Sequence, residues 1–286
     1  MPLRLDDARM MAAAVPSGVA PTEWNDLAIR FGDVYVAVTA ERAAGRYGFL
    51  ELEAQAGEIA RIREYVAGSA GRFDDVVVLG IGGSALGALA LRTALGGATA
   101  TPRLHVLDNV DPATMHALLA VLAPARTLWC VISKSGGTVE TLSQYAIARA
   151  WVERAGLPTK WHFAVVTDPE VGPLRALARR DGLAVFAVPA NVGGRFSVFT
   201  PVGTLPAALA GYDLAEFLAG AQAMRDRCDT PTLSENPAGL LATLLWRAHQ
   251  RAGQGTHVMM PYSDALQAIA PWFVQLWGES LGKRDA

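Results

Sequence analysis

The sequence has few cysteines, and its histidines are scattered. Cys130 and Cys228 are far apart and show no metal-ligand spacing, and Cys130 lies in an apolar run typical of a buried strand. The five histidines show no ligand spacing either. We therefore expect no metal ion. The sparse cysteines favour a reduced, cytoplasmic protein.

The sequence also lacks an excess of charge and long apolar runs. Its formal net charge is −2, from 25 basic and 27 acidic residues, which argues against a nucleic-acid partner. No apolar run reaches the roughly 18 residues that a membrane span requires. Asp6 and Asp7 lie where a secretory signal would be basic and then apolar, so we expect no signal peptide. With 51% hydrophobic residues, the chain can bury a large core.

Strand-length apolar runs alternate with helix-length segments in the middle of the chain. The expected strands are 76–79, 104–107, 127–132, 162–166 and 184–188, and the expected helices between them are 84–96, 112–123, 139–155 and 170–180. Apolar strands without polar interruption are typical of a parallel sheet covered on both faces. The pattern predicts an α/β fold with a doubly wound parallel sheet, which binds ligands at the carboxyl ends of its strands.

The two ends of the chain fit this pattern less well. We expect residues 1–45 to form an extended leader and residues 46–210 to form the domain that contains the sheet. Residues 211–286 are expected to hold linking helices, a strand at 256–260 and a helix at about 265–282. One strand and one helix cannot close a sheet, so this region predicts the start of a second, incomplete α/β domain.

A glycine-rich turn follows the first expected strand. In Gly80-Ile-Gly-Gly-Ser84 the missing side chains let a ligand approach the backbone, and the first amides of the following helix have no internal partner. Ser84 lies where a helix N-cap is expected. Taken alone, the turn fits a sugar-phosphate site, a dinucleotide site with Asp108 on the ribose, or a plain tight turn.

A second turn after the 127–132 strand favours the first of these alternatives. The segment Ser133-Lys-Ser-Gly-Gly-Thr138 offers three hydroxyls and one ammonium immediately before an expected helix. A phosphate dianion needs several donors around it, whereas a dinucleotide fold has no need of such a turn after its third strand. The alternative is a solvated turn in which Ser133 or Thr138 caps the helix.

These two turns, together with two later motifs, resemble the phosphosugar-binding sugar isomerase (SIS) domain and, more narrowly, the glucose-6-phosphate isomerase family. The later motifs are Gly193-Gly-Arg-Phe-Ser197 and Gln275-Leu-Trp-Gly-Glu-Ser-Leu-Gly-Lys283. The four motifs follow one another in the family's order over residues 79–283. The resemblance implies an α-β-α sandwich and an isomerase of sugar phosphates, one that works without a nucleotide or any other cofactor.

The resemblance also implies a role for each matching residue. The sugar phosphate would be held by Gly83, Ser84, Ser133, Lys134, Ser135 and Thr138. Gly194 and Gln275 would contact the substrate, Arg195 would stabilise the enediolate, and Glu279 would move the proton between C1 and C2. These roles suit the chemistry, because one carboxylate can serve both proton transfers and a guanidinium can stabilise the developing negative charge.

In the family, a histidine and a lysine beyond the glutamate motif open the sugar ring. Neither has a counterpart here, so we expect the chain to be a fragment or to be completed by another polypeptide, with little turnover of closed-ring sugar. By analogy, the full-length form is expected to be a homodimer. The open alternatives are a non-catalytic phosphosugar-binding module, an isomerase that also accepts mannose 6-phosphate, and a dinucleotide-dependent oxidoreductase.

Overall fold

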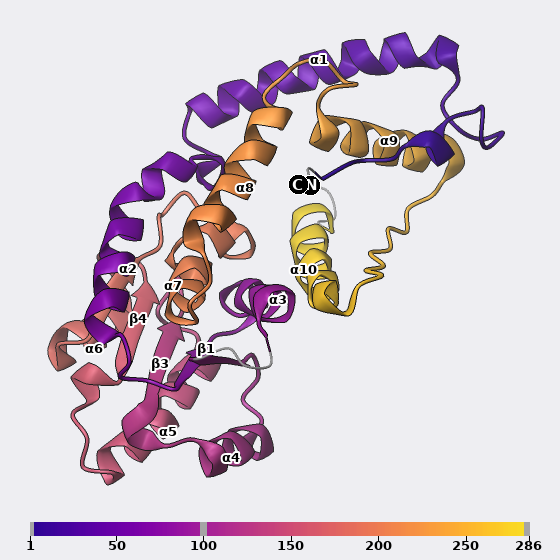
Figure 1. Cartoon of the computed structure of the whole chain (residues 1–286). Coiled ribbons are helices and arrows are strands. Elements are labelled where there is room, and N and C mark those ends of the chain that lie inside the picture. The colour runs from indigo at the N-terminus through magenta and orange to yellow at the C-terminus, as the bar shows by residue number, and fades with distance from the viewer. Residues whose placement is uncertain (1–2, 98–101, 283–286) are drawn as a thin grey trace. The chain divides into compact units, whose positions relative to one another are not determined.

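The computed structural model describes residues 3–97 and 102–282, and within them a single five-stranded parallel sheet (Figure 1). The strands are β1 (Asp75–Leu79), β2 (Arg103–Leu107), β3 (Thr127–Ile132), β4 (Phe163–Thr167) and β5 (Ala184–Ala187). Their order is β2-β1-β3-β4-β5, and every neighbouring pair is parallel. The predicted doubly wound parallel sheet is confirmed.

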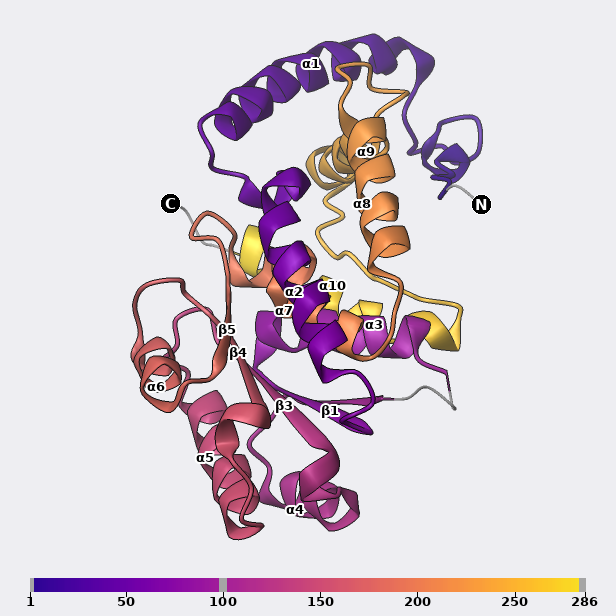
Figure 2. The same ribbon diagram turned by 60° about the vertical axis from the view of Figure 1, so that its left-hand side comes forward.

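Helices cover both faces of the sheet. They are α2 (Ala56–Ser69), α3 (Leu86–Leu95), α4 (Pro112–Val121), α5 (Val139–Arg154), α6 (Pro173–Asp181) and α7 (Pro201–Leu209). Figure 2 shows α4, α5 and α6 on one face of the strands, and α2, α3 and α7 on the other. The result is a three-layer α/β/α arrangement.

The central strands are apolar except for one polar residue at one end of each, because both of their faces are covered. Every residue of β1, β3 and β4 is buried. Trp129 of β3 stacks on Phe163 of β4 with 6.4 Å between the ring centroids, and Tyr145 of α5 meets Phe163 edge-on at 5.1 Å. Each such large side chain contributes about 1.5–3 kcal/mol by leaving water. This core holds the carboxyl ends of β1 and β3 in fixed positions.

Asp111 and Asp168 each directly precede a proline, and they behave differently. Asp111 caps α4, because its carboxylate accepts the amide of Ala113 at 2.7 Å. Asp168 instead closes a turn by accepting the amides of Glu170 and Val171. The expected start of the fourth helix at residue 170 is therefore wrong. Gly172, with φ of 103°, redirects the chain, and α6 begins at Pro173.

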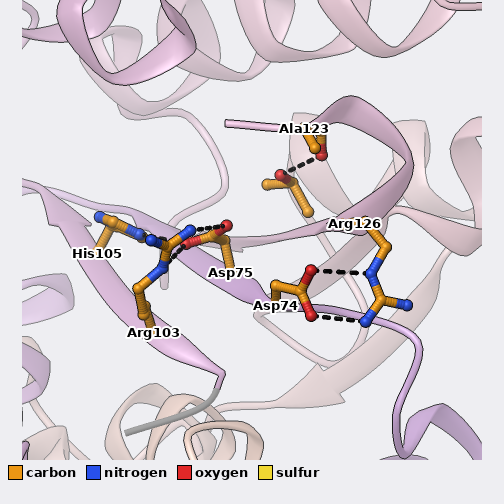
Figure 3. Close-up of polar contacts among 7 residues, drawn as sticks. Asp74, Asp75, Arg103, His105, Ala123 and Arg126 are labelled. Carbon is orange, nitrogen blue, oxygen red and sulfur yellow. Dashed lines mark hydrogen bonds and ion pairs between the residues drawn. The ribbon is translucent and has the colours of Figure 1, made fainter. Parts of the chain in front are cut away.

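Ion pairs join the first three strands at their amino ends (Figure 3). The buried carboxylate of Asp75 accepts two bonds from Arg103, both 2.8 Å, and lies 2.8 Å from Nε2 of His105. Next to it, Asp74 accepts two bonds from Arg126, of 3.0 and 2.6 Å. Because these partners come from β1, from β2 and from just before β3, the bonds reinforce the register of the three strands.

The chain divides into two compact units, and the sheet belongs to the one formed by Glu51–Glu216 and Met259–Ala286. That unit also contains α10 (Ile269–Leu281).

Among residues 3–97 and 102–282, no helix combines the length and the apolar composition that crossing a membrane requires.

The other unit, formed by Met1–Leu50 and Phe217–Val258, is helical. Its helices are α1 (Pro21–Ala43), α9 (Pro237–Ala252) and all but the start of α8 (Leu214–Cys228). α1 and α9 approach closely at Phe31, whose ring would overlap a side chain at Gly239. Arg247 of α9 also pairs with Glu23 at 2.9 Å and donates to the carbonyls of Ser17 and Gly18.

Two expectations for the ends of the chain are wrong. The extended leader contains the 23-residue helix α1, whose proline at the first position suits a helix start. The expected strand at 256–260 has no regular secondary structure, and Val258 and Met260 are exposed. A strand needs a neighbour for its backbone groups, and none pairs with this segment in the part of the chain that the structure describes. The predicted division into a leader and two domains remains a prediction.

Candidate active site

The candidate site lies where the strand order reverses. From β1 the chain crosses to β2 on one side, and from β3 it crosses to β4 on the other. The two glycine-containing turns therefore leave neighbouring strands at the same edge of the sheet. This is the switch point at which open α/β sheets bind ligands.

The turn after β1 depends on glycine at two positions. Gly82 has φ of 56°, and a Cβ there would lie 2.7 Å from Nε2 of Gln275. A Cβ on Gly83 would overlap the carbonyl oxygen of Gly194. Ser84 is not the N-cap that was expected, because it ends a short 3-10 turn and α3 begins at Leu86. The turn thus packs tightly against both later motifs.

The turn after β3 is closed by its own hydroxyls. Ser133 is buried, and its hydroxyl lies 2.9 Å from that of Thr138. Thr138 precedes the first residue of α5 but makes no side-chain capping bond, contrary to the capping alternative. The ammonium of Lys134 donates to the carbonyls of Ala190 at 3.0 Å and Val192 at 2.7 Å. Lys134 therefore ties this turn to the segment that leads to Arg195.

Arg195 is held on three sides. It lies in a 3-10 segment (η7, Gly194–Phe199), with its guanidinium carbon 4.6 Å from the ring centroid of Phe196. Its Nε donates to the hydroxyl of Ser280 at 2.8 Å, and its Nη1 lies 3.7 Å from the carboxylate of Glu279. The side chain is 23% exposed, so it is shielded from water but not sealed.

α10 presents Gln275 and Glu279 on one face, one turn apart. The side-chain amide of Gln275 donates to Oε1 of Glu279 at 2.9 Å, while Arg195 lies beside Oε2. Both carboxylate oxygens of Glu279 therefore have a polar neighbour, although the side chain is 52% exposed. A non-catalytic binding module would have no need to bring Arg195 and Glu279 this close together.

All of the predicted site residues except Ser133 line one cavity of about 420 Å³. Ser133 is buried and reaches Thr138. The cavity is lined by Ile81, Gly83, Ser84, Lys134, Ser135, Thr138, Asp168, Val171, Gly194, Arg195, Gln275 and Glu279. Asp108, the residue of the dinucleotide alternative, does not line it. Two cations and two carboxylates thus share the cavity with the hydroxyls of both turns.

Sequence reasoning missed Ile81, Asp168 and Val171 as cavity residues. A signal for Asp168 was present, since it directly follows β4 at the same edge of the sheet as the two turns. Hydrogen bonds from the amides of Val171 and Glu170, together with the charge of Lys134, hold the pKa of the Asp168 carboxyl below its usual range. These contacts favour the charged form of Asp168 in this cavity.

In the part of the chain that the structure describes, no three His, Cys, Asp or Glu side chains gather as metal ligands would. The polar groups of the cavity are instead hydroxyls, amides, two cations and two carboxylates. Fold and site together define an α/β protein whose charged, hydroxyl-lined cavity lies at the switch point of its sheet.

Comparison with known proteins identifies the family. The family model for phosphoglucose isomerase matches residues 55–285, and the chain belongs to this family. A protein of Carboxydothermus hydrogenoformans named glucose-6-phosphate isomerase is 45% identical over 266 residues, which are 89% of this chain and 57% of the relative. One of Thermus thermophilus with the same name is 42% identical over 240 residues, 83% of this chain and 56% of the relative.

Solved structures agree with this assignment. The crystal structure of a hypothetical protein from Thermus thermophilus has a TM-score of 0.81 at 38% identity and covers 93% of this chain and 64% of that chain. A glucose-6-phosphate isomerase from Chlamydia trachomatis has a TM-score of 0.72 at 31% identity, covering 79% and 44%. The chain thus spans a little over half the length of the curated relatives it matches.

Proposed function

We propose that this chain carries the isomerisation site of a glucose-6-phosphate isomerase, which interconverts glucose 6-phosphate and fructose 6-phosphate in their open-chain forms. The observation that carries the proposal is the Arg195–Glu279 pair, with 3.7 Å between Nη1 of Arg195 and Oε2 of Glu279. The pair lines the same cavity as the hydroxyls of the turns after β1 and β3. The family membership and the names of the relatives support it.

The phosphate group is assigned to the two turns. Ser84, Ser135 and Thr138 line the cavity with hydroxyls, and Lys134 adds a positive charge. Because Lys134 uses two of its three N–H donors on backbone carbonyls, one remains for a phosphate oxygen. The first amides of α5 have no partner within the helix and favour an anion at the same place.

Glu279 is assigned the proton transfers. It removes the proton from C2 of the open-chain aldose, and the electron pair of that bond forms the C1–C2 double bond of a cis-enediolate. The carbonyl oxygen on C1 takes up the negative charge, and the hydroxyl proton passes from the oxygen on C2 to the oxygen on C1. Glu279 then returns its proton to C1, which gives the ketose.

Arg195 and Gln275 assist the proton transfers assigned to Glu279. The guanidinium of Arg195 lies beside Glu279 and is therefore close to the carbons that react. It stabilises the enediolate oxygens more than the neutral substrate, as catalysis requires. Gln275 fixes one oxygen of Glu279, so that the other faces the substrate. No residue of this chain is assigned to ring opening.

The test is hydrogen exchange with solvent. Fructose 6-phosphate is incubated with the chain in D₂O, and loss of the C1 proton signal is followed by NMR. Its keto form needs no ring-opening step by the protein. We expect exchange at C1, and a loss of at least about 100-fold in Glu279→Gln. No exchange above the protein-free rate would refute the proposal.

The matched control is Glu153→Gln. Glu153 is an exposed glutamate of α5 with an i, i+4 partner, since Nε of Arg149 donates to it at 2.7 Å. The same charge is removed from a helix surface outside the cavity. We expect exchange in this variant to equal that of the wild type. An equal loss in both variants would show that Glu279 acts only through the charge of the protein.

A further inference from the structure

Ser280, the residue after the proposed proton shuttle, bridges α10 and Arg195. Its hydroxyl donates to the carbonyl of Leu276, one turn earlier in the helix, at 2.5 Å. The oxygen of the same hydroxyl accepts the Nε–H of Arg195 at 2.8 Å. The hydrogen bond to the backbone fixes the orientation of the Ser280 hydroxyl, and the hydroxyl oxygen in turn fixes the orientation of the Arg195 guanidinium.

This bridge bears on the distance between Arg195 and Glu279. A hydrogen-bonded pair of guanidinium and carboxylate has N–O distances of about 2.7–2.9 Å. Here the distance is 3.7 Å, so the two groups are neighbours without a tight bond. Nε is bonded to Ser280, and the guanidinium lies over the ring of Phe196. These two contacts leave little freedom for Arg195 to turn onto the carboxylate.

We propose that Ser280 is a positioning residue for the isomerisation. It holds the guanidinium of Arg195 beside the place where the enediolate forms, and it keeps Arg195 from forming a short bidentate pair with Glu279. The carboxylate then remains available to take the proton. This inference rests on the proposed function of Arg195 and Glu279, but it concerns a contact that exists without substrate.

A simpler role for Ser280 is a local one. Serine and threonine in helices often bond the carbonyl four residues back, with no further purpose. Thr93 of α3 does so, donating to Leu89 at 2.9 Å. Ser280 differs because its oxygen also accepts from a charged group on another segment. Thr93 is therefore the matched control, since Thr93→Val removes a backbone-bonded hydroxyl from outside the cavity.

The first experiment compares turnover with binding. In Ser280→Ala we expect the maximal rate of C1 exchange on fructose 6-phosphate to fall roughly 10- to 100-fold, the effect of losing a hydrogen bond to a charged group. The Kd for inorganic phosphate should stay within about twofold, because the two turns are untouched. Ser280→Thr, which keeps a hydroxyl able to bond the same carbonyl, should restore most of the rate.

Three results would overturn the inference: an unchanged exchange rate in Ser280→Ala, an equal loss in Thr93→Val, or no recovery in Ser280→Thr at an unchanged unfolding temperature. A parallel fall in phosphate affinity and unfolding temperature would indicate a merely structural role and would overturn it as well.

A second experiment does not depend on activity. By NMR of the free protein, the Nε–H of Arg195 should exchange slowly with water in the wild type and in Thr93→Val, and rapidly in Ser280→Ala. Fast exchange in the wild type refutes the bridge, whatever the activity. A protected Nε–H in a wild type without C1 exchange refutes the proposed function instead, so the two failures are distinguishable.

Discussion

The amino ends and the carboxyl ends of the strands carry similar charged groups in opposite arrangements. We call these two sides of the sheet the amino edge and the carboxyl edge. At the amino edge, Asp75 and Arg103 share two bonds of 2.8 Å, and Asp74 is bound equally closely by Arg126 (Figure 3). At the carboxyl edge, Arg195 and Glu279 lie 3.7 Å apart and line a cavity of about 420 Å³. Charges that bind each other fully stabilise the fold, whereas charges held just apart can act on a ligand.

The largest effect is expected from a substitution that breaks the Arg195–Glu279 pair at the carboxyl edge. Arg195→Ala should lower the rate of C1 exchange about 100- to 1,000-fold, because a fixed charge that stabilises the intermediate is lost. The free energy of unfolding should fall by only about 1–2 kcal/mol, from the lost contacts with Ser280 and Phe196, since the pair with Glu279 is loose and partly exposed. Exchange by NMR and urea unfolding measure the two quantities. A large loss of stability with a normal exchange rate would mean that this pair stabilises the fold instead of acting on the ligand.

The converse change breaks the amino-edge network. Asp75→Asn removes the charge that binds Arg103 and His105, and should cost about 1–3 kcal/mol of unfolding free energy. Arg103 can still reach water, which limits the cost. The exchange rate per folded molecule should stay at the wild-type value, because this edge is remote from the cavity. Urea unfolding checks the first expectation, and a fall in the exchange rate at full folding would contradict the second.

A smaller effect is expected from the turn after β3. Gly136 has φ of 68°, and a Cβ there would lie 3.2 Å from both the amide nitrogen of Leu174 and the hydroxyl of Thr167. Gly136→Ala should cost about 1–2 kcal/mol of stability and weaken phosphate binding, because the left-handed backbone becomes strained.

Gly137, the next residue, is the matched control for this turn, since a Cβ at Gly137 would meet no heavy atom within 4 Å. Gly137→Ala should therefore leave stability and phosphate affinity nearly unchanged. Calorimetric titration with inorganic phosphate and thermal unfolding measure both variants. Equal losses in the two would show that the turn needs flexibility rather than one particular backbone conformation.

The smallest expected effect concerns pH. Hydrogen bonds from Arg126 hold the pKa of the Asp74 carboxyl below its usual range. The folded protein therefore binds fewer protons at Asp74 than the unfolded chain does near pH 4. Its contribution to stability is complete above about pH 5 and is lost as the pH falls through the lowered pKa.

Asp74→Asn tests this contribution. The variant lacks the titrating group, so its urea midpoint should fall less between pH 6 and pH 3 than that of the wild type. An identical slope in the two proteins would show that the Asp74–Arg126 pair contributes no linked stability.

Much of the sheet could be predicted because strands that are buried on both faces consist almost entirely of apolar residues. β1, β3 and β4 are apolar apart from one polar residue at one end of each, and each was located to within about one residue. The site residues were predicted from the two turns that follow β1 and β3 and, through the family resemblance, from the two later motifs that contain Arg195 and Glu279. The geometry that brings Arg195 to Ser280 spans 85 positions of sequence, and no local pattern signals it.

The errors arose where local pattern and tertiary setting disagree. α1 carries the exposed β-branched residues Val34, Val36 and Val38, which do not suggest a helix, yet its other face packs against α9. Residues 256–260 have the apolar character of a strand but no neighbouring strand to pair with in the described chain. A strand depends on its partner, and the partner cannot be read from the strand itself.

The central claim is that the turns after β1 and β3 hold one phosphate group together. The most direct test is a titration of the isotope-labelled protein with inorganic phosphate, following the backbone amide signals of Ser84 and Thr138 by NMR. The account predicts that both signals move along one binding curve with a single Kd. Movement of only one signal, or two clearly different Kd values, would contradict it.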